Sequence, residues 1–208
     1  MNDLVTFANT DSFEKIDLAI RNTEGCITGD FDHHAGLYKG IDVRLMQLGE
    51  GSFEGRLGLG MSEKVTIHLS VCNQSVEQHV IADANRFAFC VSPSKTHAHA
   101  VFGNANLSAP VLVLPPRGEA VMIVPAGVPL LTMTIDRDFM LQSESLLSGV
   151  AAWFEALGPD GETIDSQTLA SRLLNDVSLK LWDEVGIRSR ERLQAMDQLS
   201  VSNVANAF

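Results

Sequence analysis

Apolar and polar residues alternate along several short segments between residues 26 and 135. Residues 43–48 and 65–69 show the pattern most clearly, and in residues 87–91 large and small apolar side chains alternate. A period of two is typical of strands. Glycines interrupt the pattern, as at residues 49–51, where tight turns are expected. Many short strands joined by turns predict a β-sandwich or a closed barrel.

The period becomes helical at both ends of this region. Phe13, Ile16 and Ile20 fall on one helical face near the start of the chain, which predicts a short amphipathic helix there. After Asp136 an apolar stripe at helical spacing runs to Leu157. It consists of Phe139, Leu146, Leu147, Val150, Phe154 and Leu157.

Gly and Pro at residues 158–161 end this first helix, and a second is expected from about Ser166 to Gly186. The predicted fold is therefore α+β and mainly β. The predicted divisions are a β domain with its helix at 1–136, a helical hairpin at 137–186 and a linker at 187–208.

Charge and composition exclude several classes of function. The 208 residues carry a net charge of -11, so the chain itself should repel nucleic acid phosphates. Apolar runs are too short to span a membrane, and residues 1–10 show no secretory signal, so a cytoplasmic protein is expected. Cys26, Cys72 and Cys90 form neither a metal pair nor a disulfide framework, and reduced, buried thiols are predicted.

Three segments carry a resemblance to a known family. They are residues 48–57 (LGEGSFEGRL), residues 73–78 (NQSVEQ) and residues 124–127 (VPAG), which precede the predicted helix pair. Together they resemble the effector-binding half of AraC/XylS-type transcription activators over nearly the whole chain. The first two are most similar to the subgroup of regulators of amine and ethanolamine catabolism.

The resemblance implies a cupin-like jelly-roll barrel that binds a small-molecule inducer, with an amine or its oxidation product as the leading hypothesis. It also implies that the helices form a homodimer, and that DNA is bound by two helix-turn-helix units that these 208 residues do not show. Leu173, Leu174, Val177, Leu181 and Trp182 are the candidate dimer residues. The alternative for this stripe is packing against the barrel.

Candidate ligand contacts combine apolar and polar side chains, because ligand sites are mostly apolar with a few placed polar groups. The apolar candidates are Phe87, Phe89, Phe102 and Met122, and the polar ones are Glu77, His79 and Arg86. Phe87 and Phe89 share one face of a strand, so both point inward or both outward. The alternative is that these aromatic residues belong to an ordinary core.

A metal site is the competing interpretation, resting on His97 and His99, which a strand would place on one face. A metal cupin would place a further histidine after the Pro125 to Gly127 corner, where this chain has Leu130 and Leu131. We therefore expect no metal, no cofactor and no enzyme activity. A metal-dependent isomerase or oxygenase and a non-catalytic interaction module remain the alternatives.

The other histidines have plainer interpretations. His33 and His34 lie in an acidic stretch that is interpreted as a surface loop, and His68 and the candidate contact His79 are more often structural groups than ligands.

Overall fold

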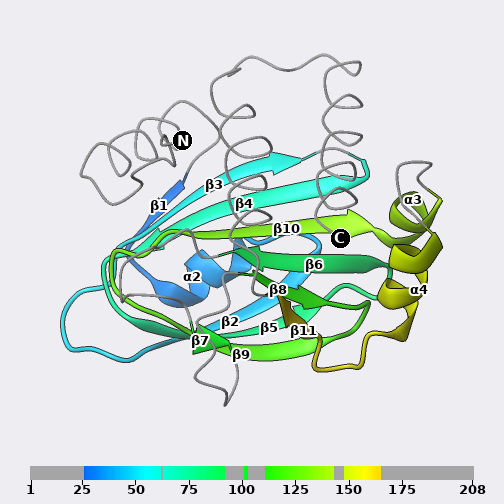
Figure 1. Ribbon diagram of the computed structural model, residues 1–208. Helices are drawn as coiled ribbons and strands as arrows, with labels where there is room; N and C mark the ends of the chain where they lie inside the picture. Colours follow the sequence, from blue (N-terminus) through cyan, green and yellow to red (C-terminus); the bar gives the residue numbers. More distant parts are fainter. Residues whose placement is uncertain (1–25, 62, 92–100, 103–110, 143–147, 165–208) are drawn as a thin grey trace, which may run out of the picture.

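The computed structural model describes residues 26–61, 63–91, 101–102, 111–142 and 148–164. Within these, the strands form two antiparallel sheets, one of seven strands and one of four (Figure 1). The larger sheet has the order β1 (Cys26–Thr28), β3 (Gly55–Met61), β4 (Val65–Cys72), β10 (Leu130–Asp136), β6 (Arg86–Val91), β8 (Val111–Leu114) and β11 (Glu162–Ile164). The smaller has the order β2 (Ile41–Gln47), β5 (Val76–Ala82), β9 (Glu119–Val124) and β7 (Val101–Phe102).

The two sheets face each other across an apolar layer, which we call the interior cluster. It includes Tyr38, Val43, Leu45, Val80, Cys90, Met122 and Leu130. In β2 and β5 buried residues alternate with more exposed ones, because one face of the four-stranded sheet packs on this layer and the other is more exposed to solvent.

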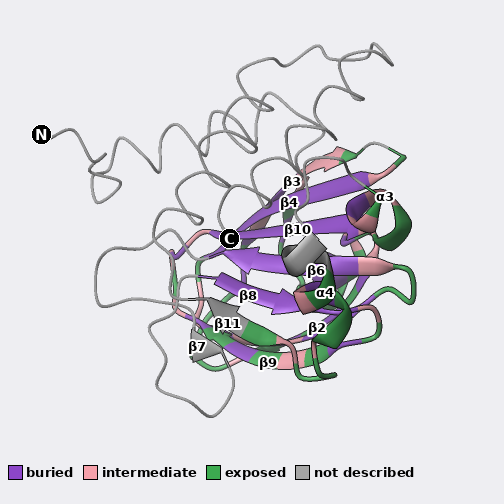
Figure 2. Ribbon diagram, turned by 45° about the vertical axis from the view of Figure 1, so that its right-hand side comes forward, coloured by how far each residue is buried: buried purple, intermediate pink, exposed green. Residues whose placement is uncertain are grey.

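The seven-stranded sheet is different, because its central strands are buried on both faces. Every residue of β4 and β8 is buried, and so are most residues of β10 and β6 (Figure 2). On the face away from the smaller sheet lies a second apolar layer, the outer cluster. It includes Ile67, Phe87, Phe89, Val113, Met133, Met140 and Phe154.

Three short helices are described. Asp30 caps α2 (Phe31–Gly36) through a 2.7 Å hydrogen bond that its carboxylate accepts from the His33 amide. Asp136, the last residue of β10, caps α3 (Arg137–Leu141) in the same way. α4 (Ser148–Ala156) adds Phe154, whose ring contacts Phe87 and Phe89, so α3 and α4 contribute to the outer cluster at one end of the sheet (Figure 1).

The predicted strands at 43–48, 65–69 and 87–91 are confirmed as β2, β4 and β6. Residues 48–54 form a loop with bends at residues 49–51, and β3 begins only at Gly55. The structure also forms two separate sheets where a closed barrel was an option.

The stripe from Phe139 to Leu157 predicted one helix, but the described part contains two, α3 and α4. β11 was not predicted. The N-terminal helix, the second helix of the hairpin and the 187–208 linker lie outside the described residues, and the domain division stays a prediction. Within the described ranges, no helix is long and apolar enough to cross a membrane.

Candidate functional site

The interior of the sandwich contains a line of polar side chains. β4 has the sequence VTIHLSVC, and its apolar residues Val65, Ile67 and Leu69 belong to the outer cluster. Since neighbouring residues of a strand point to opposite faces, Thr66, His68 and Ser70 face the space between the sheets. All three are buried, so the usual arrangement of apolar-in and polar-out is reversed on this strand.

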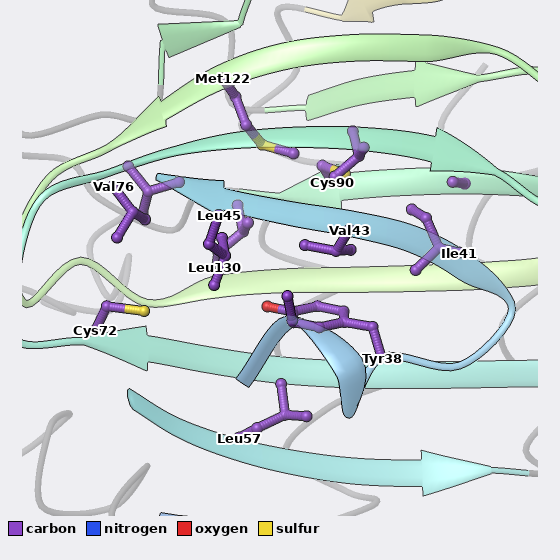
Figure 3. Close-up of a cluster of buried hydrophobic side chains, with 14 of the residues drawn as sticks. Tyr38, Ile41, Val43, Leu45, Leu57, Cys72, Val76, Cys90, Met122 and Leu130 are labelled. Carbon is purple, nitrogen blue, oxygen red and sulfur yellow. The ribbon is translucent and has the colours of Figure 1, made fainter. Parts of the chain in front are cut away.

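Tyr38 lies at the centre of this space (Figure 3). It follows α2, and its ring stacks at a tilt on His68 with 4.9 Å between ring centroids. Burial raises the pKa of Tyr38 well above its ordinary value, and the nearby side chains of Ser70 and Gln78 lower it by less. The hydroxyl nevertheless has no partner at hydrogen-bond geometry.

Four buried side-chain atoms in this region lack a hydrogen-bond partner. They are Tyr38 Oη, His68 Nδ1, Gln78 Nε2 and Thr132 Oγ1, and we call these residues the polar cluster. Thr132 of β10 pairs with His68 of β4 in the sheet register, while Gln78 lies on β5 of the opposite sheet. An unsatisfied buried polar group costs about 1–3 kcal/mol, so the cluster is an energetic cost that packing alone does not explain.

The protonation pattern of His68 follows from a backbone contact. The Lys39 amide donates to His68 Nε2 at 2.9 Å, so Nε2 is the acceptor and Nδ1 carries the proton. Nδ1 is therefore an N–H donor. The Thr132 backbone is near enough to raise the pKa of His68 and so offset part of the effect of burial, but it is not placed at hydrogen-bond geometry to Nδ1. Gln78 Nε2 is also a donor, whereas the Tyr38 and Thr132 hydroxyls can donate or accept.

The interior is uncharged at neutral pH. Burial lowers the pKa of His34 and of His68 to about 4. Burial also raises the pKa of the Cys72 thiol to about 11 and that of the Cys90 thiol to about 12. Among the residues that the structure describes, no Asp, Glu, Lys or Arg is buried, so the described side chains offer only uncharged hydrogen-bonding groups in the interior.

A second hydrogen-bonded chain supports the cluster from α2. His34 Nδ1 lies 3.0 Å from Thr28 Oγ1, and His34 Nε2 lies 2.9 Å from Ser70 Oγ. Thr28 in turn donates to the Gly55 carbonyl at 3.4 Å. A Cβ at Gly55 would lie 2.5 Å from His34 Nδ1, so glycine at this position leaves room for the imidazole that holds Ser70.

The sandwich has a counterpart among solved structures. It is similar to the crystal structure of the AraC-like transcriptional activator CuxR, with a TM-score of 0.59 and 12% sequence identity over 88% of this chain and 69% of that chain. No family model and no curated protein matches the sequence. At this identity the likeness establishes the fold, and the site must be argued from its own residues.

The predicted apolar contacts divide between the outer face of the larger sheet and the interior between the sheets. Met122 is fully buried in the interior cluster, opposite Gln78 in the register. Phe87 and Phe89 do share a face, but it is the outer one, where both rings contact Phe154. The Phe102 side chain lies outside the described residues, so its expected role stays a prediction.

The predicted polar contacts lie away from the interior. Glu77 and His79 flank the inward-facing Gln78 on β5 and are on the solvent side, where His79 lies 3.7 Å from Glu119.

Arg86 is the first residue of β6 and already has hydrogen-bond partners. Its guanidinium donates to the carbonyls of Glu63 and Lys64 and to the hydroxyl of Thr134. These bonds give Arg86 a structural role.

Sequence reasoning missed the polar cluster, although a signal existed. Val76, Gln78 and Val80 share one face of β5, so the valines identify Gln78 as the inward residue. The loop expected at His33 and His34 is instead helix α2, in which His33 is exposed and His34 is fully buried.

The remaining candidates concern metal binding and dimerisation. Within the described ranges, no group of three or more His, Cys, Asp or Glu side chains is placed to hold a metal ion. Leu130, at the position where a metal cupin would have histidine, is buried in the interior cluster. The metal candidates His97 and His99 lie outside the described residues. So do the dimer candidates Leu173, Leu174, Val177, Leu181 and Trp182, and both hypotheses stay predictions.

Proposed function

We propose that this chain is the effector-binding part of a bacterial transcription regulator of the AraC type, and that its effector binds at the polar cluster. Two observations support this. The fold resembles that of a solved AraC-like activator, and four buried polar atoms of the sandwich have no hydrogen-bond partner in the described part of the chain. The second carries the proposal, because buried polar groups without partners call for a ligand or a water to complete them.

The proposed role is binding without chemistry. The two interior thiols are held protonated by burial, and a protonated thiol is a poor nucleophile. The interior imidazoles are neutral hydrogen-bonding groups. We propose a small-molecule effector, either an amine or its oxidation product, and no cofactor.

In the proposed regulator the sensor acts on DNA through a helix-turn-helix part encoded beyond residue 208, in the cytoplasm. The apolar stripe Leu173, Leu174, Val177, Leu181 and Trp182 is the proposed homodimer contact. An effector controls such a regulator only if it binds the active and inactive states with different affinity.

A first experiment reads the coding frame beyond codon 208. We expect a continuation that encodes two helix-turn-helix units. A stop codon at that point would contradict the part of the proposal that places DNA binding in the same polypeptide.

A second experiment measures the melting temperature with pools of sugars, amino acids, amines, aldehydes, amides and carboxylic acids. We expect at least one pool to raise the midpoint. The rise should disappear in Gln78→Met, which removes an inward donor, and should persist in His79→Gln, the neighbouring residue on the solvent face. A rise that survives Gln78→Met would place the effector elsewhere, and no rise from any pool would refute effector binding by this chain.

One observation favours a protein-interaction module as a second candidate. Met46, Val121 and Ile123 are 52%, 43% and 41% exposed, and the register places them together on the outer face of the four-stranded sheet. Alanine at these positions would impair such a function without changing the response to small molecules.

A further inference from the structure

We propose that the effector is an uncharged molecule with a carbonyl oxygen, of the aldehyde, ketone or amide class, which accepts hydrogen bonds from His68 Nδ1 and Gln78 Nε2. This inference rests on the proposed function and narrows it. It selects the aldehyde that results from oxidation of an amine over the amine itself.

The first argument is the balance of donors and acceptors. His68 Nδ1 and Gln78 Nε2 are fixed donors without partners, since the Lys39 amide occupies His68 Nε2. The other two unpartnered atoms are hydroxyls, which adapt to either role. The four unpartnered atoms of the cluster thus include two obligatory donors and no obligatory acceptor, so the complementary ligand atom is an acceptor.

The second argument excludes a cationic ligand. A buried ammonium needs acceptors and a compensating negative charge, because an unpaired buried charge is far more costly than an unpaired dipole. Among the described residues no carboxylate is buried. The nearest acidic side chain on β5, Glu77, lies on the opposite face of the strand from Gln78.

The third argument concerns an anionic ligand. A carboxylate would accept from the same donors but would need a cation nearby. His68 cannot supply one without losing its contact with Lys39, because a protonated Nε2 would direct its N–H at the backbone N–H that now donates to it. The Lys39 charge acts on His68, but the Lys39 side chain is exposed to solvent. The Arg86 guanidinium already donates to the carbonyls of Glu63 and Lys64.

The residues beside these donors are apolar and would suit a hydrocarbon substituent on the ligand. In the register Gln78 lies between Leu45 of β2 and Met122 of β9, and both are buried in the interior cluster. Cys90 pairs with Thr132 on the opposite sheet. A small carbonyl compound with an apolar chain therefore matches both the donors and their surroundings.

The test compares three head groups on the same carbon chains. The probes are straight-chain amides of two to six carbons, with the amines and carboxylates of equal length, measured at pH 7.5 by thermal unfolding. We expect at least one amide to raise the melting temperature by on the order of 5 °C at about a hundred times its Kd. The amine and carboxylate of that length should give no shift. NMR of ¹⁵N-labelled imidazole should show the His68 Nδ1 proton shifted by the amide only.

Variants connect the response to the cluster. Gln78→Met and Thr132→Val should each raise the Kd for the amide at least tenfold, and His79→Gln should leave this Kd unchanged. If an amine, a carboxylate or a sugar binds and Gln78→Met abolishes that binding, the carbonyl class is wrong while the sensor proposal stands. If the amides and all pools give no shift, both proposals fail.

Discussion

Thr132 and Thr134 form a natural pair for measuring the cost of the polar cluster. They lie two residues apart on β10, face the same interior, and are both fully buried. Thr134 Oγ1 accepts a hydrogen bond from Arg86 at 3.4 Å, whereas Thr132 Oγ1 has no partner. Replacing each by valine exchanges a hydroxyl for a methyl group in the same environment.

The two substitutions should change stability in opposite directions. Thr132→Val removes a desolvated hydroxyl that costs about 1–3 kcal/mol and adds a buried methyl group worth about 0.8 kcal/mol. Imperfect fit of the new methyl group offsets part of this, so we expect a net gain of about 1–2 kcal/mol. Thr134→Val gains the same methyl group, with the same imperfect fit, but loses a hydrogen bond worth about 1 kcal/mol. Arg86 keeps its carbonyl partners, so we expect a small net loss of less than about 1 kcal/mol.

Chemical denaturation of both variants without ligand measures the difference, with thermal unfolding as a second readout. For a chain of this size the gain in Thr132→Val corresponds to a rise of roughly 2–8 °C in the midpoint. If Thr132→Val is destabilised as much as Thr134→Val, the hydroxyl of Thr132 is already hydrogen-bonded in the free protein. An uncompensated cost at Thr132 would then no longer favour ligand binding at the polar cluster.

Three further outcomes are expected. Because burial lowers the pKa of His34 and His68 to about 4, the unfolded chain binds more protons between pH 6.5 and 4. Stability should therefore be complete above pH 6.5 and fall by about 3 kcal/mol per histidine as the pH drops to 4; a flat urea midpoint across this range would contradict it. Gly55→Ala should cost about 1–3 kcal/mol because its Cβ would overlap His34, whereas Gly36→Ala, with no atom within 4 Å of the added Cβ, should stay within about 1 kcal/mol of the parent; equal denaturant midpoints would show that the imidazole yields freely. Phe154→Ala should cost about 3–5 kcal/mol in equilibrium unfolding, since its ring is buried; a loss below 1 kcal/mol would mean that α4 does not hold the outer cluster.

The sequence predicts the position of strands better than the direction in which they face. Period-two alternation located β2 and β4 because these strands alternate chemically as well as geometrically. In β6, which is apolar after Arg86, only the size of the side chains alternates. In β5, polar residues occupy three successive positions from Glu77 to His79, so polarity alone does not say which one points inward. The flanking valines, Val76 and Val80, are on the same face of β5 as Gln78, so they identify Gln78 as the residue that points inward.

Other errors have different physical causes. The larger sheet is buried on both faces, so the shared face of Phe87 and Phe89 could be identified but its direction could not. α2 is six residues long, too short for a helical period, and its formation depends on the Asp30 cap and on burial of His34. The polar cluster joins side chains from Tyr38 to Thr132 through sheet pairing, which no local pattern encodes.

Strand β10 connects the interior of the sandwich to the outer cluster. It lies in the middle of the larger sheet, with Thr132 turned toward the interior and Met133 toward the helices. Its final residue, Asp136, is also the first hydrogen-bonding group of α3. If an effector binds beside Thr132 as proposed, a shift of the β10 backbone would also move Met133 and Asp136. The packing of Met140 and Phe154 would then change as well, because close-packed interiors transmit such displacements.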